Sequence, residues 1–150
     1  MPKETILLLN PEIHVQQSIK ALLEMEKYIV ITVNSVNRAK QNFKEFEISA
    51  LITDYWVDHD CTVDHIRELK GSFPELYVMM LTNKDLEDRE YRKIMDAGID
   101  DLFLKPFSNE KILLHLKKGL KQRKIFLQKR RFEKELNQIK GKRDIQIAVG

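Results

Sequence analysis

Short apolar runs alternate with segments of helical spacing along the first 120 residues. The runs are rich in residues that favour strands, and they cover residues 5–9, 28–33, 50–53, 76–81 and 102–104. Most of them are continuously apolar, which is typical of parallel strands covered by helices on both faces. Five such strand-and-helix units with short connections predict an α/β fold, a doubly wound parallel sheet with strand order 2-1-3-4-5.

Polar and small residues mark where the helices between these strands begin and end. Asn10 followed by Pro11 predicts the start of the first helix, and Asp85 predicts the start of the fourth. The buried face of the fourth helix, which should end at the Ala-Gly pair 97–98, is expected to hold Leu86, Ile94 and Met95. The last helix is expected to begin at Ser108 and, after a long extension, to end at Gly141.

The formal charge of +3 over 150 residues hides two unlike parts of the chain. Residues 1–107 hold 13 Lys and Arg against 19 Asp and Glu, a charge of −6, whereas residues 108–150 hold 13 against 4, a charge of +9. The lone Cys61 excludes an internal disulfide framework. No apolar run approaches the roughly 18 residues of a membrane span, and no signal peptide is recognisable, so we expect a cytoplasmic protein.

Three polar side chains of complementary chemistry follow the predicted third, fourth and fifth strands: Asp54, Thr82 and Lys105. Because the carboxyl ends of parallel strands meet at one edge of a doubly wound sheet, we expect these side chains to lie together there. A carboxylate can take a phosphoryl group, an ammonium can neutralise its charge, and a hydroxyl can hydrogen-bond its oxygens. The sequence therefore predicts a phosphoryl-handling site.

Three segments carry a resemblance to a known family. Leu51–Asp54 and Met80–Thr82 contain two of the site residues, and Asp96–Phe107 combines a helix end, a short strand and a Lys-Pro-Phe turn. Over about residues 3–120 the chain resembles the response-regulator receiver domain of two-component signalling. The resemblance implies a flavodoxin-like (βα)5 fold with a receiver domain at residues 1–120, and it implies signalling instead of stand-alone enzymatic turnover.

The resemblance also implies roles for individual residues. Asp54 matches the phosphoacceptor, Thr82 the switch hydroxyl and Lys105 the invariant lysine of the family. The peptide bond from Lys105 to Pro106 is expected to be cis. A sensor histidine kinase is the implied phosphoryl donor, and Mg²⁺ is the implied cofactor.

The acidic pair that usually follows the first strand in this family is not retained. Asn10 and Pro11 occupy its two positions, and Glu12 comes one place later. Mg²⁺ prefers carboxylate, phosphate and water oxygens, so these replacements weaken the metal site unless Glu12 reaches into it. The expected metal ligands are Asp54, Glu12, weakly Asn10, and the backbone of Trp56.

Other residues around the site also depart from the family pattern. Trp56 is expected to overhang the site, Asn83 to narrow its entrance, and Leu102 takes the place of the switch aromatic residue. The nearby run Asp58–Cys61 with His65 matches none of the usual zinc-ligand spacings. It predicts a surface loop.

From Ser108 the helical pattern continues beyond the length of a receiver's last helix. One apolar stripe can pack against the sheet: Leu113, Leu116, Leu120 and Leu127. A second stripe, offset around the helix, is left without a core: Ile125, Phe132, Leu136 and Ile139. A partner helix is the simplest way to bury it, even though Lys129 falls on its seam. We therefore predict a helical linker or coiled-coil extension at residues 121–150, with a homodimer through this helix as one outcome.

The basic run Lys129–Arg131 raises the alternative of nucleic-acid binding. The tail carries no helix-turn-helix pattern and no aromatic platform, which favours the linker or dimerisation helix. After Gly141, apolar residues alternate at positions 145, 147 and 149, which indicates the start of another element. We accordingly expect a receiver cut from a longer protein, with its output domain outside this chain.

Two functions stay open from the sequence. In the first, a histidine kinase phosphorylates Asp54 and the last helix transmits the change. In the second, the chain is a phosphorylation-independent pseudo-receiver that serves as a protein interaction or dimerisation module. The lost acidic pair favours the second, and the convergence of Asp54, Thr82 and Lys105 favours the first, which is our main prediction.

Overall fold

The computed structural model describes residues 4–83 and 85–149, with side chains described as far as residue 141. Residues 1–3 and 84 of the predicted receiver domain, and residue 150 of the predicted helical extension, lie outside the described residues. Five parallel strands form the centre of the fold: β1 (Thr5–Leu9), β2 (Ile29–Val33), β3 (Ala50–Asp54), β6 (Tyr77–Thr82) and β7 (Asp101–Leu104). Their order is β2-β1-β3-β6-β7. This confirms the predicted sheet, because β6 and β7 are its fourth and fifth strands.

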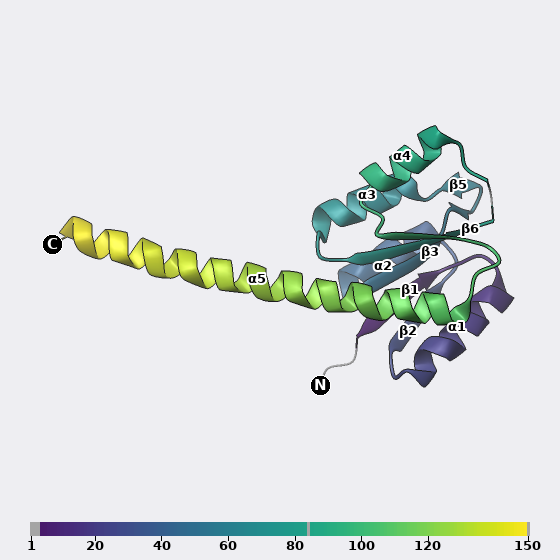
Figure 1. Cartoon of the computed structure of the whole chain (residues 1–150), viewed down its shortest axis with the longest axis horizontal. Helices are drawn as coiled ribbons and strands as arrows, with labels where there is room; N and C mark the ends of the chain where they lie inside the picture. The colour runs from purple at the N-terminus through teal and green to yellow at the C-terminus, as the bar shows by residue number, and fades with distance from the viewer. Residues whose placement is uncertain (1–3, 84, 150) are drawn as a thin grey trace.

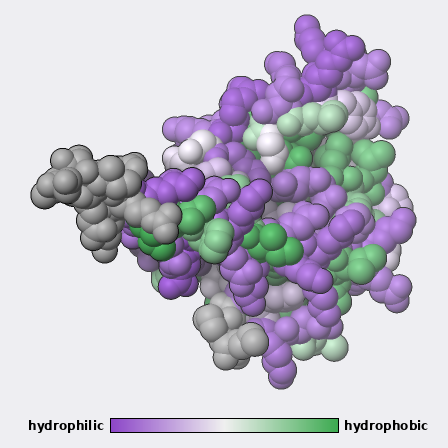
Figure 2. Space-filling view, turned by 60° about the vertical axis from the view of Figure 1, so that its left-hand side comes forward, coloured by the Kyte–Doolittle hydropathy of each residue, from purple (hydrophilic) through white to green (hydrophobic). Residues whose placement is uncertain are grey.

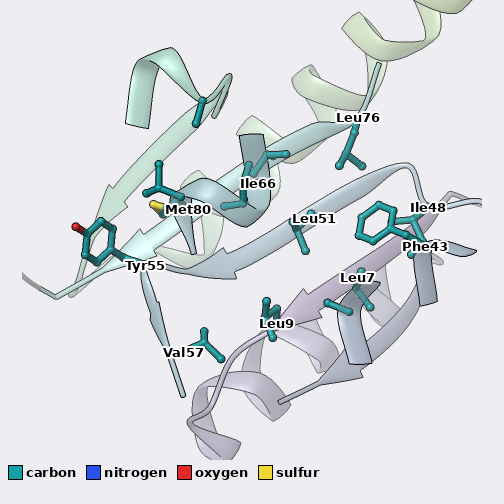
Figure 3. Packing of buried hydrophobic residues seen from close by; sticks show 14 of the residues in the cluster. Leu7, Leu9, Phe43, Ile48, Leu51, Tyr55, Val57, Ile66, Leu76 and Met80 are labelled. Carbon is teal, nitrogen blue, oxygen red and sulfur yellow. The ribbon is translucent and has the colours of Figure 1, made fainter. Parts of the chain in front are cut away.

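Helices cover both faces of the sheet (Figure 1). On one face lie α1 (Ile13–Met25) and α5 (Asn109–Val149), and on the other lie α2 (Val36–Glu45), α3 (Val63–Ser72) and α4 (Asp88–Asp96). Strand side chains alternate between the two faces, so Ile6 and Leu8 join the α1 and α5 side while Leu7 and Leu9 join the other. Figure 3 shows the second of these cores, which supports the end of β3.

Two predicted helix starts are wrong. Asn10 still pairs with β2, because its N–H donates to the Val33 carbonyl, so α1 begins at Ile13 with Glu12 at the cap position. The fourth helix begins at Asp88 with Glu87 as its cap, not Asp85. A capping box between Glu87 and Glu90 satisfies the backbone reciprocally, which a lone aspartate cannot do.

The ends and the buried face of α4 follow the sequence only in part. The helix ends at Asp96 with Ala97 as its C-cap, and Gly98 adopts a φ of 86°, as its position after the last turn requires. Ile94 is buried as expected, but Met95 is 76% exposed and Leu86 precedes the helix. The helix is therefore shorter than predicted, and its apolar face is narrower.

The predicted surface loop after Asp54 contains a small antiparallel hairpin, which the sequence analysis missed. Strands β4 (Trp56–Val57) and β5 (Asp60–Cys61) pair across a two-residue turn. Both turn residues, Asp58 and His59, have positive φ values of 53° and 60°, the combination that a type I′ hairpin turn needs. Asp-His lacks the usual Asn-Gly signal, so periodicity alone did not reveal this turn.

Helix α5 runs from the sheet far past the body of the molecule (Figure 1). Ser108 precedes it as predicted, and its Oγ accepts the Lys111 N–H at 3.4 Å. The predicted end at Gly141 is wrong, because the helix continues to Val149 and so includes the stretch expected to begin a new element. An exposed helix tolerates one glycine at a modest cost in free energy. None of the described helices combines the length and apolar composition needed to cross a membrane.

Candidate functional site

Three strands deliver the predicted site residues to one edge of the sheet. Asp54 is the last residue of β3, Thr82 is the last of β6, and Lys105 follows β7 directly. Backbone pairing extends to this edge, since the Lys105 N–H donates to the Thr82 carbonyl at 2.7 Å. The Lys105–Pro106 bond is cis, as predicted. The structure therefore brings together the three residues that sequence reasoning selected.

Lys105 and Asp54 form a largely buried ion pair. The Lys105 Nζ lies 3.3 Å from the Asp54 Oδ2, with side-chain exposures of 18% and 13%. Burial raises the pKa of the Asp54 carboxyl above its ordinary value, and the nearby Lys105 ammonium partly offsets this rise. The ion pair thus holds a carboxylate in a place where desolvation alone would favour the protonated acid.

Glu12 also reaches toward this ion pair. Its Oε2 lies 3.9 Å from the Lys105 Nζ, although the side chain is 65% exposed. Its negative charge adds to the upward shift of the Asp54 pKa. Two carboxylates from different parts of the chain therefore face one ammonium group, and Glu12 does approach the site.

The site opens to the surface through a hollow of about 370 Å³. Its lining residues are Asp54, Tyr55, Trp56, Thr82 and Asn83. Trp56 is half exposed and Thr82 is almost fully buried, so the aromatic ring stands at the rim while the hydroxyl lies deeper. Trp56 and Asn83 both line the hollow, and the narrowing of its entrance by Asn83 stays a prediction.

Asn10 lies beside the site but is turned toward the backbone. It is 1% exposed, and its Oδ1 accepts the Glu12 N–H at 2.8 Å. Its buried Nδ2 has no hydrogen-bond partner among the described residues. An amide nitrogen repels a cation, and the amide oxygen is already engaged, so Asn10 contributes little to a metal site.

The donor set suits a cation that keeps most of its water. Asp54 and Glu12 are its two carboxylates, and among the described residues no group of three or more His, Cys, Asp or Glu side chains is arranged to hold a metal. Mg²⁺ is commonly bound through one or two carboxylates, with waters and phosphate oxygens completing its shell. The residues present therefore fit Mg²⁺, with fewer carboxylate ligands than Asp54 and an acidic pair together would supply.

Sequence reasoning missed two residues that shape the site. The Thr62 hydroxyl donates to the Asp54 carbonyl at 2.8 Å and to the Tyr55 carbonyl at 3.2 Å, which closes the hairpin segment back onto β3. The Tyr55 hydroxyl donates to the Glu90 Oε2 at 2.7 Å. The sequence shows only that an aromatic residue, Tyr55, directly follows Asp54. It does not show the contact with Glu90, which lies 35 positions away.

The comparisons with known proteins agree with this geometry. A family model described as the response regulator receiver domain matches residues 6–117. The chain is 32% identical over 91 residues to the two-component response regulator ORR7 of Oryza sativa subsp. japonica, a match that covers 59% of this chain and 43% of that protein. The chain therefore spans less than half the length of this curated relative.

Solved structures share the fold. A CheY-like response regulator receiver domain protein from Methanospirillum hungatei is similar with a TM-score of 0.77 and 17% identity, covering 82% of this chain and 98% of that one. The beryllofluoride-activated NtrC4 receiver domain, solved as a dimer, is similar with a TM-score of 0.72 and 26% identity, covering 79% and 98%.

Proposed function

Because the chain belongs to the response regulator receiver domain family, we propose that it accepts a phosphoryl group on Asp54 from a sensor histidine kinase and transmits the change through its helices. The observation that carries this proposal is the Lys105 ammonium 3.3 Å from a buried carboxylate at the strand edge. A structural ion pair needs no open hollow beside it. Here Thr82 and Asp54 line the same hollow, which gives a phosphodonor access.

The proposed transfer uses the three site residues in distinct ways. One carboxylate oxygen of Asp54 forms a bond to phosphorus while the bond from phosphorus to the donor's histidine nitrogen breaks, and the imidazole leaves with that electron pair. Lys105 faces the negative charge on the phosphoryl oxygens, and the Thr82 hydroxyl donates a hydrogen bond to one of them. Loss of the ion pair with Asp54 then frees the ammonium to bind the new group.

Mg²⁺ is the proposed cofactor. Asp54 and Glu12 would hold it, with the backbone of Trp56 and, weakly, Asn10. When bound, the ion supplies positive charge against the phosphoryl oxygens. We propose that this activity is one step of a phosphorelay in the cytoplasm. We do not propose stand-alone enzymatic turnover, because the transfer described above modifies Asp54 of this chain and involves no separate substrate.

Incubation with acetyl phosphate and Mg²⁺ tests the proposal. The P–O bond of the donor breaks, acetate leaves, and the intact protein is expected to gain the mass of one phosphoryl group. Asp54→Asn keeps the shape of the side chain but removes the nucleophile, so this variant should gain none. Absence of a gain in the wild type, or an equal gain in the variant, would contradict phosphorylation at Asp54 and favour the pseudo-receiver.

A second proposal concerns residues 125–139 of α5, whose exposed apolar face we propose pairs with the same helix of a second copy. Its exposed apolar residues are Ile125, Phe126, Phe132, Leu136 and Ile139. Figure 2 shows hydrophobic side chains along α5 among hydrophilic ones. A heptad register with Phe132 and Leu136 in the seam places Glu135 at a g position and Lys140 at an e position, where opposite charges meet between parallel helices.

Sedimentation measures this pairing. The wild type is expected to sediment as a dimer at concentrations where Phe132→Glu is monomeric, because a carboxylate in the seam loses its water without gaining a partner. Asn137→Glu adds the same charge one position outside the seam and should leave the dimer intact. A monomeric wild type at its highest attainable concentration would rule out this interface.

A further inference from the structure

Tyr55 is held rigidly beside the phosphoacceptor. Its N–H donates to the Asp54 Oδ1 at 3.2 Å and to the Leu81 carbonyl at 2.9 Å, and its carbonyl accepts the Thr62 N–H at 3.0 Å. The side chain is 8% exposed and packs in the core between the sheet and α2, α3 and α4. Figure 3 shows its hydroxyl pointing away from the other labelled side chains of that core.

The other end of Tyr55 reaches the start of α4. Its hydroxyl donates to the Glu90 Oε2 at 2.7 Å, and the Glu90 Oε1 accepts the Glu87 N–H at 3.3 Å. One carboxylate therefore caps the helix and binds Tyr55. Tyr55 therefore links the two sites: its backbone N–H binds the Asp54 carboxylate, and its hydroxyl binds the first turn of α4.

Helix α4 buries little of its surface against the rest of the described chain. Of its nine residues Ile94 is buried, and the helix is exposed along most of its length. A hydrogen bond to a charged carboxylate contributes more to stability than a bond between neutral groups. The Tyr55–Glu90 bond therefore ties the first turn of α4 to the body, in addition to the packing of Ile94 in the core.

We propose that Tyr55 is a positioning residue that couples the state of Asp54 to the position of α4. The inference rests on the proposed function, since the coupling has a purpose only if Asp54 changes its charge. Tyr55 lines the hollow that receives the phosphoryl group, so added charge and volume there act on the ring that holds Glu90. Leu102 stands at the usual position of the switch aromatic and has no hydroxyl, whereas Tyr55 carries one and follows β3 directly.

Hydrogen exchange of the full chain in the resting state is the first test. Tyr55→Phe removes the hydroxyl and keeps the ring in the core, so α4 amides are expected to exchange at least about threefold faster while α1 and α2 are unchanged. Tyr91→Phe, on α4 itself, is the matched control and should not change these rates. Equal α4 exchange in Tyr55→Phe and the wild type overturns the inference.

Exchange after treatment with acetyl phosphate and Mg²⁺ is the second test, scaled to the phosphorylated fraction found by intact mass. Phosphorylation is expected to alter α4 exchange in the wild type, and Tyr55→Phe should reduce that response at least threefold. An undiminished response in the variant overturns the coupling. If the wild type gains no phosphoryl mass, the proposed function has failed, and faster resting exchange in Tyr55→Phe still supports the structural link from Tyr55 to α4.

Discussion

Replacement of Lys105 by Met is expected to slow phosphoryl incorporation on Asp54 by about a hundredfold or more. The ammonium lies 3.3 Å from the Asp54 Oδ2 and is buried enough that water replaces it poorly. Removal of one preorganised electrostatic group from such a site typically costs roughly 10²–10³ in rate. Intact mass measured against time, with acetyl phosphate and Mg²⁺, gives this rate directly.

Removal of the Lys105 ammonium affects the nucleophile, Asp54, as well as the phosphoryl group. Lys105 lowers the pKa of Asp54, whereas burial and Glu12 raise it. Without the ammonium, the Tyr55 N–H still lowers this pKa, but burial and Glu12 outweigh it more strongly, and the Asp54 carboxyl binds its proton more tightly. A larger share of the protein is then protonated at a given pH, and the rate of the variant should recover partly as the pH is raised.

Lys70→Met provides a matched control. The Lys70 Nζ lies 3.1 Å from the Asp100 Oδ2, and its side chain is 16% exposed, close to the 18% of Lys105. Its removal breaks a similar ion pair away from the strand edge, so incorporation on Asp54 should stay within about twofold of the wild type. An equal loss of rate in both variants would show that Lys105 acts through stability alone.

The second large effect is expected at Gly119, where α5 crosses the sheet. A Cβ at this position would lie 2.2 Å from the Tyr77 Cδ1, much closer than two carbon atoms can approach. The Tyr77 ring is 4% exposed, and its hydroxyl donates to the Asp101 carboxylate, so the ring cannot easily move aside. Gly119→Ala is therefore expected to lower the free energy of unfolding by about 2–3 kcal/mol.

Denaturant unfolding monitored by circular dichroism checks this value, and Gly71→Ala is the matched control. Gly71 also lies in a helix, and a Cβ there meets no atom within 4 Å. Alanine at that position should leave the free energy of unfolding unchanged or raise it by up to about 1 kcal/mol. Similar stabilities of the two variants would mean that α5 is free to move away from β6.

Much of the fold could be predicted because its signals are local. Continuous apolar runs at strand length and apolar residues at helical spacing depend only on neighbouring positions, and they indicated five strand-and-helix units in the observed order. The sheet rule that collects strand ends at one edge then selected Asp54, Thr82 and Lys105. Helix caps were less predictable, since the Glu87–Glu90 capping box competes with an equally plausible Asp85 nearby.

The site's finer arrangement depends on contacts between residues distant in the sequence. The approach of Glu12 to Lys105 joins the cap of α1 to the residue after β7, and the Tyr55–Glu90 bond joins the residue after β3 to α4. No periodicity reports such pairs, because they exist only after the elements have packed. The hairpin at Asp58 and His59 was hidden for a related reason: positive φ values are rarer at these residues than at Asn-Gly, and the surrounding fold makes them favourable here.

The opposite charges of the two chain segments also show what the sequence determines and what only the tertiary structure decides. The sequence by itself determined that an acidic body carries a basic helical tail with an apolar stripe. Tertiary structure decided how the two are joined: Arg123 of α5 reaches Glu4 and Glu47 at 3.8 and 3.6 Å, and Arg130 reaches Glu75 at 3.6 Å. Charge content is a property of composition, but which carboxylates the α5 arginines meet depends on how the buried face of α5 packs on the sheet.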